Sequence, residues 1–300
     1  MAANLALTIG RREVPITHPG KVLFPASGVT KADLARHYQR VAPAMVSHVK
    51  GRPVAMQAFP GGVERGGFFM KEVPGHFPDW IHRVTVPKRG GTVTHVVADD
   101  AATLVYLAGQ NVITPHVWPA RGDRPREPDR LIFDFDPSGP SFAQVRAAAR
   151  ETGERLRDLG LAPYAMVSGS RGVHVVVPLR RGPSFTDLHR FARALAERLV
   201  ADDPRRLTLT WRKAERGERI YVDVNRNAYA QHAAAAYAVR PRPDAPVAMP
   251  VHWEELWDRR LRPDRWTVAT AGDRLESEGD AWAGMARHAR ALPQPPAAAA

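Results

Sequence analysis

The chain has 300 residues and a mass of 33.1 kDa, and its 44% hydrophobic and 25% charged residues are typical of a globular protein. It has no cysteine, which excludes disulfides, thiolate nucleophiles and cysteine-ligated zinc. It also has no apolar run of the roughly 18–20 residues that a membrane span needs, so we expect a cytoplasmic protein without membrane contact. The formal net charge of +12 favours a polyanionic partner, nucleic acid above all.

The first 120 residues are expected to form an N-terminal α/β module. Thr30 is a suitable N-cap for a helix over 29–51, and Pro43 is expected to split or kink this helix. The elements expected after it are a strand over 53–59, a hairpin over 80–99 that turns at 88–91, a helix over 100–112 and a strand over 113–118. The arginine- and proline-rich loop that follows marks the boundary of this module.

The second part of the chain, residues 121–292, is expected to form one catalytic module. Its expected elements are a strand over 131–136, a helix over 141–159, strands over 163–168 and 173–178, a helix over 184–200 and a strand over 219–224. The order β-α-β-β-α-β is that of the ferredoxin-like split unit, which RNA-recognition folds and polymerase palms also use. The fold class is therefore α+β, and the low-complexity residues 293–300 are expected to be a disordered tail or linker.

The segment RLIFDFDPSGP places two aspartates, Asp134 and Asp136, inside an apolar run. Because side chains alternate along a strand, both carboxylates point to one face, and Phe133 and Phe135 point to the other. Adjacent carboxylates repel one another and resist desolvation unless a cation lies between them, and a divalent metal ion is the obvious candidate. The simpler interpretation is that Asp136 caps the following turn and Asp134 pairs with a basic side chain.

The segment SGSRGVHVVV joins two of the expected strands. Its two glycines permit positive φ, so successive backbone N–H groups can form a concave nest for an anion. Ser168 and Ser170 add hydroxyl donors, Arg171 adds a planar fork that suits phosphate, and His174 begins the next strand. Taken alone, the same residues are also compatible with an ordinary hairpin turn and a structural histidine.

A third acidic residue, Asp223, shares a face of the last expected strand with Tyr221, although a lone aspartate there can also be a cap. In a β-α-β-β-α-β sheet the first and last strands can be neighbours, so three carboxylates can converge beside the nest. Such hard oxygen ligands suit Mg²⁺ or Mn²⁺, and two of these ions can stabilise the attacking and leaving oxygens at phosphorus. The set therefore favours phosphoryl or nucleotidyl transfer on nucleic acid.

These segments also resemble a known family. LIFDFDP, SGSRGVHVVVPL and YVDVNRN, in this order, are similar to the three-motif signature of the archaeo-eukaryotic primase superfamily. Within it they most resemble the polymerase domain of bacterial ligase D, which acts in non-homologous end joining. The similarity extends to ITHPGKVLFPASGVTKADLARHY, GGFFMKEVP, DWIHRVTV, ITPHVW and AYAVRPRPDAPVAMPVHWEEL, and so covers nearly the whole chain.

The resemblance implies roles for individual residues. The residues that would bind the two catalytic metal ions, Mn²⁺ or Mg²⁺, are Asp134, Asp136 and Asp223. The residues that would contact the incoming NTP or dNTP are Ser168, Ser170, Arg171, His174, His116 and Arg240. Lys21 and Lys31 would bind the 5′-phosphate of a DNA end, and Phe68 and Phe69 would stack on template bases. Without the resemblance, these last four would be interpreted as ordinary surface and core residues.

The implied activity is the addition of nucleotides, with ribonucleotides preferred, to DNA ends, gaps and overhangs. The implied fold joins an RNA-recognition-like catalytic sheet to an N-terminal α/β module with DNA-end contacts. The implied partners are broken DNA with 5′-phosphates, Ku and an ATP-dependent DNA ligase, and the implied location is the nucleoid. Two alternatives stay open from the residues alone: a metal-dependent nuclease and a non-catalytic DNA-end-binding module.

Overall fold

The computed structural model describes residues 5–139 and 141–296, and these residues form two compact units. The first unit contains the described residues up to Asp123 and the segments 232–249 and 266–280. The second unit contains residues 124–231, 250–265 and the described residues from Ala281 onward. Two segments of the range 121–292 thus pack within the first unit, and the division into functional modules 1–120 and 121–292 stays a prediction. Residues 297–300 of the expected tail lie outside the described residues.

The first unit is built on an antiparallel sheet with the strand order β15-β9-β5-β8-β7, and β6 pairs with β5 beside this path. These strands are β5 (Pro53–Ala58), β6 (Phe68–Met70), β7 (Arg83–Lys88), β8 (Gly91–Val97), β9 (Val112–Val117) and β15 (Ala233–Ala234). Lys88 pairs with Gly91, which confirms the predicted hairpin turn. Two small sheets that the sequence analysis did not predict are formed by β1 (Leu5–Ile9) with β2 (Arg12–Ile16) and by β3 (Val22–Phe24) with β4 (Val29–Thr30).

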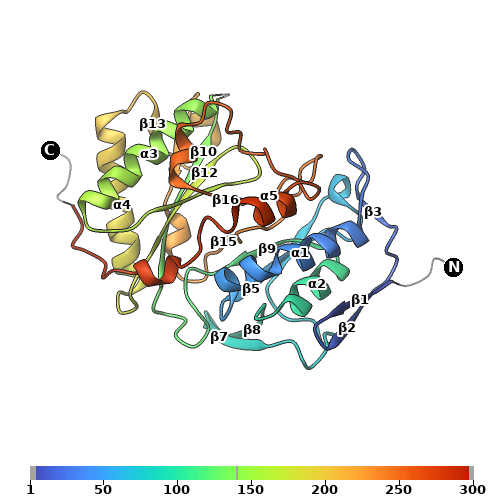
Figure 1. Ribbon diagram of the computed structural model, residues 1–300. Coiled ribbons are helices and arrows are strands. Elements are labelled where there is room, and N and C mark those ends of the chain that lie inside the picture. The colour runs from blue at the N-terminus through green and yellow to red at the C-terminus, as the bar shows by residue number, and fades with distance from the viewer. Residues whose placement is uncertain (1–4, 140, 297–300) are drawn as a thin grey trace. The chain divides into compact units, whose positions relative to one another are not determined.

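The helices of the first unit are α1 (Lys31–Val49), α2 (Ala101–Gly109) and α5 (Ala271–Glu278), and α1 packs alongside α2 (Figure 1). Thr30 is the N-cap of α1, as predicted, and forms a reciprocal capping box with Asp33. The helix is continuous through Pro43, so the prediction of a split there is wrong. Val41 and Met45, on either side of the proline, are completely buried, and this packing offsets the backbone hydrogen bond that proline cannot make.

The second unit is built on a six-stranded sheet with the order β13-β14-β10-β12-β11-β16. Its elements are β10 (Arg130–Pro137), α3 (Phe142–Asp158), β11 (Tyr164–Val167), β12 (Val173–Pro178), α4 (Phe185–Asp202), β13 (Leu207–Thr208), β14 (Ile220–Asp223) and β16 (Met249–Val251) (Figure 1). The predicted β-α-β-β-α-β order is confirmed. The four predicted strands lie side by side in the order β14-β10-β12-β11, which is the ferredoxin-like order. The edge strands β13 and β16 were not predicted.

One face of this sheet forms the core of the second unit. Phe133 and Phe135 of β10 and Val222 of β14 are completely buried, and both α3 and α4 contact β10. The opposite face of β10 carries Asp134 and Asp136, which are partly exposed. The alternation predicted for this strand is therefore confirmed. Within the described residues, no helix is long and apolar enough to cross a membrane.

Candidate active site

Three neighbouring strands of the second unit place acidic and basic side chains on one face. In the antiparallel registers, Asp134 of β10 lies opposite His174 of β12 on one side and opposite Asp223 of β14 on the other. Directly paired residues of antiparallel strands point to the same face with their Cβ atoms about 5 Å apart. Asp136 is two residues further along β10 and shares this face. The sheet thus brings together the three aspartates that the sequence analysis selected.

Each of the three carboxylates has a basic partner. Asp136 Oδ1 lies 3.2 Å from Arg171 Nη2, and Asp136 Oδ2 lies 3.4 Å from Arg216 Nη1. Asp134 Oδ1 lies 3.4 Å from His174 Nε2, and Asp223 Oδ2 lies 3.3 Å from Arg226 Nη2. The three arginines balance the charge of the acidic cluster, which would otherwise be costly at partly buried positions.

Arg216 and Tyr221 are site residues that the sequence analysis did not select. The side chain of Arg216 is almost completely buried, and its guanidinium carbon lies 4.0 Å from the centre of the Tyr221 ring, a cation–π contact. The Tyr221 hydroxyl donates to Asp223 Oδ1 at 3.4 Å, and burial together with this carboxylate raises the pKa of Tyr221 to about 12. No local pattern distinguishes Arg216 from the other arginines of its loop, because its partners lie on different strands.

The loop between β11 and β12 departs from the predicted anion nest. The N–H groups of Ser170 and Gly172 donate to Ser168 Oγ at 3.3 and 3.0 Å, and the N–H of Gly169 donates to the Pro263 carbonyl at 2.9 Å. These three N–H groups are not free to bind an anion, so the prediction that they form a backbone nest is wrong. The side chain of Arg171 is exposed, and its predicted contact with phosphate stays a prediction.

Gly172 is required for space rather than for positive φ. A Cβ atom at this position would lie 2.1 Å from the carbonyl oxygen of Phe135, which is a severe clash with the backbone of β10. Phe135 separates the two aspartates of that strand. The glycine therefore allows the loop to approach the strand that carries the acidic residues. Gly169, by contrast, does have the positive φ that was expected of both glycines, at 64°.

The donor set fits a hard divalent cation in its chemistry. Asp134, Asp136 and Asp223 supply carboxylate oxygens only, on adjacent strands and on one face, as Mg²⁺ and Mn²⁺ prefer. Among the described residues, however, no three histidine or acidic side chains are already gathered around one metal position. The carboxylates point toward the basic partners instead, so metal binding by these residues stays a prediction.

His116 and Arg240, the two other predicted nucleotide contacts, belong to the first unit. His116 of β9 makes an edge-to-face contact with Phe69 of β6, with ring centres 5.0 Å apart, and both rings contact His232. His232 was not selected from the sequence, because its neighbours in the chain are mostly alanines. Phe68 and Phe69 are 52% and 45% exposed, so a ligand can reach both rings. Their roles stay predictions.

The two predicted end-binding lysines line one cavity of the first unit. Lys21 and Lys31 face a volume of about 620 Å³ together with His18, Gln110 and Asn111. Lys31 Nζ donates to the Gly109 carbonyl at 3.0 Å, and Lys21 Nζ donates to the Pro60 carbonyl. Burial and the nearby Lys21 lower the pKa of Lys31. The structure therefore brings these lysines together, and it leaves them without a carboxylate partner among the described residues.

The helix N-terminus beside these lysines is not free for a phosphate. The N–H groups of Lys31 and Ala32 donate to the carbonyls of Lys21 and Pro19, and the N–H of Asp33 donates to Thr30 Oγ1. The first three N–H groups of α1 are therefore not available to a phosphate. The positive charge of this cavity comes from the two lysines.

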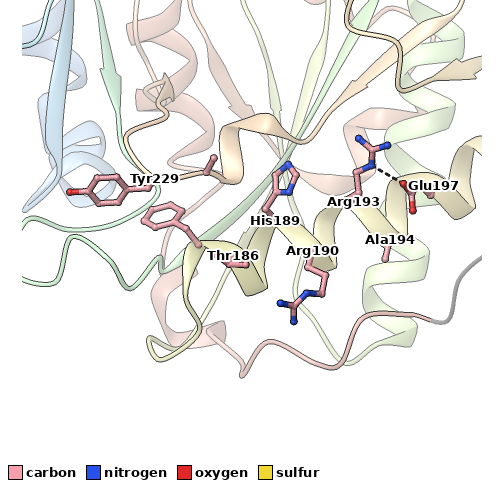
Figure 2. A pocket seen from close by; sticks show the side chains of 9 residues that line it. Thr186, His189, Arg190, Arg193, Ala194, Glu197 and Tyr229 are labelled. Atoms are coloured by element: carbon pink, nitrogen blue, oxygen red, sulfur yellow. Dashed lines mark hydrogen bonds and ion pairs between the residues drawn. The ribbon is translucent and has the colours of Figure 1, made fainter. Parts of the chain in front are cut away.

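A separate cavity of about 630 Å³ extends along α4, and no residue with a predicted role lines it (Figure 2). Phe185 and Tyr229 form its aromatic end, with ring centres 5.7 Å apart. Further along α4, Arg193 and Glu197 form an ion pair at 2.7 Å. The charges of these two residues neutralise one another. Glu197 is the only acidic residue in the lining, so the cavity has no acidic cluster like the one on the sheet.

A ferredoxin-like sheet with carboxylates on its neighbouring strands β10 and β14, beside a loop that presents an exposed arginine, is typical of primase-type nucleotidyltransferases. A family model described as the LigD primase-polymerase domain matches residues 30–282. The chain therefore belongs to the LigD primase-polymerase domain family, which confirms the resemblance, the fold class and the assignment as a nucleotidyltransferase.

The similarity to individual relatives is consistent with this family. The chain is 35% identical over 279 residues to the multifunctional non-homologous end joining DNA repair protein LigD of Mycobacterium tuberculosis, covering 88% of this chain and 37% of that protein. It is 29% identical over 292 residues to LigD of Pseudomonas aeruginosa, covering 95% of this chain and 34% of that protein. The chain thus spans about a third of the length of these relatives.

A solved structure described as the polymerase domain of Mycobacterium tuberculosis ligase D in complex with DNA superimposes with a TM-score of 0.85. The two chains are 32% identical, and the match covers 91% of this chain and 98% of the other. The mixed α/β fold is therefore shared over almost the whole of both chains.

Proposed function

We propose that this domain adds nucleotides to the 3′ ends of broken DNA during end joining. The observation that carries the proposal is the row formed by His174, Asp134 and Asp223 across three adjacent strands, within the range that the primase-polymerase family covers. The net charge of +12 supports a nucleic-acid substrate. A nuclease would use similar carboxylates but would have no need for a nucleotide.

Asp134, Asp136 and Asp223 would hold two divalent ions, Mn²⁺ or Mg²⁺. When bound, such ions stabilise the charge on the attacking and leaving oxygens at phosphorus. The carboxylates would then exchange guanidinium partners for metal, which frees Arg171 and Arg216 for the nucleotide phosphates. Arginine suits this role because its planar fork binds phosphate in bidentate geometry.

The other predicted contacts would position the nucleotide and the DNA. Ser168 and Ser170 would contact the nucleotide beside Arg171, and His174, His116 and Arg240 would complete its site. Lys21 and Lys31 would bind a recessed 5′-phosphate, since a terminal phosphate monoester carries more charge than an internal diester. Phe68 and Phe69 would stack on unpaired template bases, an interaction worth about 1–3 kcal/mol per base.

Several finer properties belong to the same proposal. Ribonucleotides would be preferred over deoxyribonucleotides, and Mn²⁺ over Mg²⁺. The DNA partners would be double-strand breaks, gaps and overhangs, and the protein partners would be Ku and an ATP-dependent DNA ligase. The protein would act in the cytoplasm, in association with the nucleoid. The names of the LigD relatives, which are end-joining proteins, support this context.

A primer-extension assay with the full chain tests the proposal. The assay compares a gapped DNA with each of NTP and dNTP, in Mg²⁺ and in Mn²⁺, and a reaction without nucleotide. We expect extension that depends on nucleotide and metal and is fastest with NTP and Mn²⁺. Primer shortening without nucleotide would identify a nuclease instead. Tight DNA binding with neither extension nor shortening would identify a non-catalytic end-binding module.

A further inference from the structure

An arginine-rich cavity of about 440 Å³ lies in the second unit, beside the loop between β11 and β12. The end of β10, the first turn of α3 and the segment 259–264 form its walls. Its basic lining residues are Arg146, Arg171, Arg259 and Arg262, and the only carboxylate in the lining is Asp264. With four guanidinium groups and one carboxylate, the lining of the cavity has an excess of positive charge.

Arg146 is the most unusual of these arginines, because it is only 6% exposed and has no carboxylate partner among the described residues. Its Nη1 donates to the backbone carbonyls of Leu256, at 3.5 Å, and Asp258, whereas its Nε has no acceptor. Burial lowers the pKa of Arg146, and the neighbouring Arg150 lowers it further, whereas the Asp258 carboxylate acts in the opposite direction. A buried guanidinium is costly without an anion, so this position favours the binding of one.

Two other features of the cavity are also favourable to an anion. Within the described part of the chain, Arg259 makes no ion pair or hydrogen bond through its side chain, and Arg262 has only a 3.5 Å contact with Asp264. Phe142 and Ala143, the first two residues of α3, line the cavity, and their N–H groups have no acceptor within the helix. The positive end of the helix dipole thus adds to the field of the arginines.

We propose that this cavity is a subsite for pyrophosphate, the leaving group of the nucleotidyl transfer, and this inference rests on the proposed function. In that reaction the primer 3′-hydroxyl gives its proton to water, its oxygen bonds to the α-phosphorus, and the bond from that phosphorus to the bridging oxygen breaks. The electron pair stays on the bridging oxygen of the departing pyrophosphate. Arg171 connects the cavity with the acidic cluster, because it lines the cavity and its Nη2 lies 3.2 Å from Asp136 Oδ1.

The shape and charge of the cavity favour pyrophosphate over a DNA strand. Four guanidinium groups around one concavity match a compact ligand with several negative charges, whereas a strand spreads one charge per phosphate along a surface. Pyrophosphate held here would be separated from the acidic cluster, which would leave the metal-binding carboxylates ready for the next nucleotide.

Calorimetric titration of the full chain with inorganic pyrophosphate, without divalent metal, DNA or nucleotide, tests the subsite. The variant combines Arg259→Ala with Arg262→Ala, and the matched control is Arg260→Ala, whose side chain is 88% exposed and does not line the cavity. We expect the double variant to bind pyrophosphate at least about tenfold more weakly, and the control to match the wild type. Absence of binding to the wild type, or equal affinity in all three proteins, would overturn the proposal.

Primer extension with the same proteins separates the leaving group from the nucleotide itself. We expect the double variant to need about tenfold more pyrophosphate for inhibition, with its apparent KM for nucleotide within about twofold of the wild type. A raised KM with unchanged inhibition, or weaker DNA binding with unchanged pyrophosphate binding, would show that the cavity serves another ligand. If the arginine variants lose pyrophosphate binding but the wild type extends no primer, the subsite stands and the proposed function fails.

Discussion

At the scale of single residues, Asp134 is the centre of the acidic row, because it has a paired neighbour on each side. It lies between His174 and Asp223, whereas Asp136 reaches the same face two residues further along. The Asp134 carboxylate lies close enough to interact with both paired neighbours. Asp136 and Asp223 occupy other positions, so they cannot replace it.

Replacing the acidic residues should stop nucleotide addition without stopping DNA binding. For Asp134→Asn and Asp223→Asn we expect extension rates to fall by roughly a thousandfold, since metal stabilisation at phosphorus is worth several kcal/mol. DNA affinity should be retained, because it comes mainly from basic residues on phosphates. Single-turnover extension and a binding titration measure the two effects. Glu197→Gln on α4 is the control, and near wild-type extension by either aspartate variant would contradict the metal assignment.

Gly172 offers a second test at this scale. In Gly172→Ala the new methyl group would lie 2.1 Å from the Phe135 carbonyl, so β10 or the loop must shift. We expect a loss of about 1–3 kcal/mol in the free energy of unfolding, typical of overpacking, and a loss of extension because Asp134 and Asp136 flank Phe135. Urea denaturation and primer extension measure these. Gly75→Ala, where the methyl group meets no atom within 4 Å, should change neither.

At the scale of elements, the lysine cavity is assembled from several segments that are far apart in the chain. Lys21 precedes β3, Lys31 begins α1, and Gly109 ends α2. The Thr30 side chain and the carbonyls of Lys21 and Pro19 accept the N–H groups of the first turn of α1, so the two lysines are the cationic groups that this cavity offers to a phosphate. The site thus depends on where β3, α1 and α2 meet, and on the charge of two side chains.

The lysines should determine whether a 5′-phosphate is recognised. We expect gapped DNA with a recessed 5′-phosphate to bind the wild type roughly ten- to a hundredfold more tightly than the same DNA with a 5′-hydroxyl. Lys21→Ala combined with Lys31→Ala should remove this difference, and Lys50→Ala should preserve it. Binding titrations with the two DNAs decide the matter. An equal loss of affinity for both DNAs would mean that the lysines only add general positive charge.

At the scale of the whole molecule, the free energy of unfolding depends on pH where a buried side chain resists protonation. His37 of α1 is almost completely buried, and its Nε2 lies 3.0 Å from the Tyr237 carbonyl. Burial lowers the pKa of His37 to about 4, so the folded chain does not take up this proton until the pH is well below the unfolded value near 6.5. The unfolded chain binds more protons in this window, and unfolding becomes easier as the pH falls.

The pH dependence of unfolding tests this directly. Between pH 7 and pH 5 we expect His37 alone to lower the free energy of unfolding by about 2 kcal/mol, because only the unfolded chain is protonated there. In His37→Gln, which keeps an N–H donor for Tyr237, this contribution should disappear. Urea denaturation of both proteins at the two pH values gives the difference. Parallel pH profiles for the wild type and the variant would show that His37 does not contribute.

Features that depend on neighbours within a few residues could be predicted from the sequence. The period of two along 130–136 placed Asp134 and Asp136 on one face, and Thr30 marked the start of α1. The order of strands and helices was sufficient for the ferredoxin-like sheet, because crossover rules leave few alternatives. The acidic site could therefore be predicted before its geometry was known.

The partners of these residues could not be predicted from the sequence, because hydrogen bonds and ion pairs join positions far apart in the chain. Arg216 reaches Asp136 across 80 positions, and the Pro263 carbonyl accepts the N–H that was expected to bind an anion. The space beside Gly172 is set by a carbonyl on another strand, and the packing around Pro43 keeps α1 continuous. Such contacts depend on which surfaces meet in three dimensions, and periodicity along one segment carries no information about them.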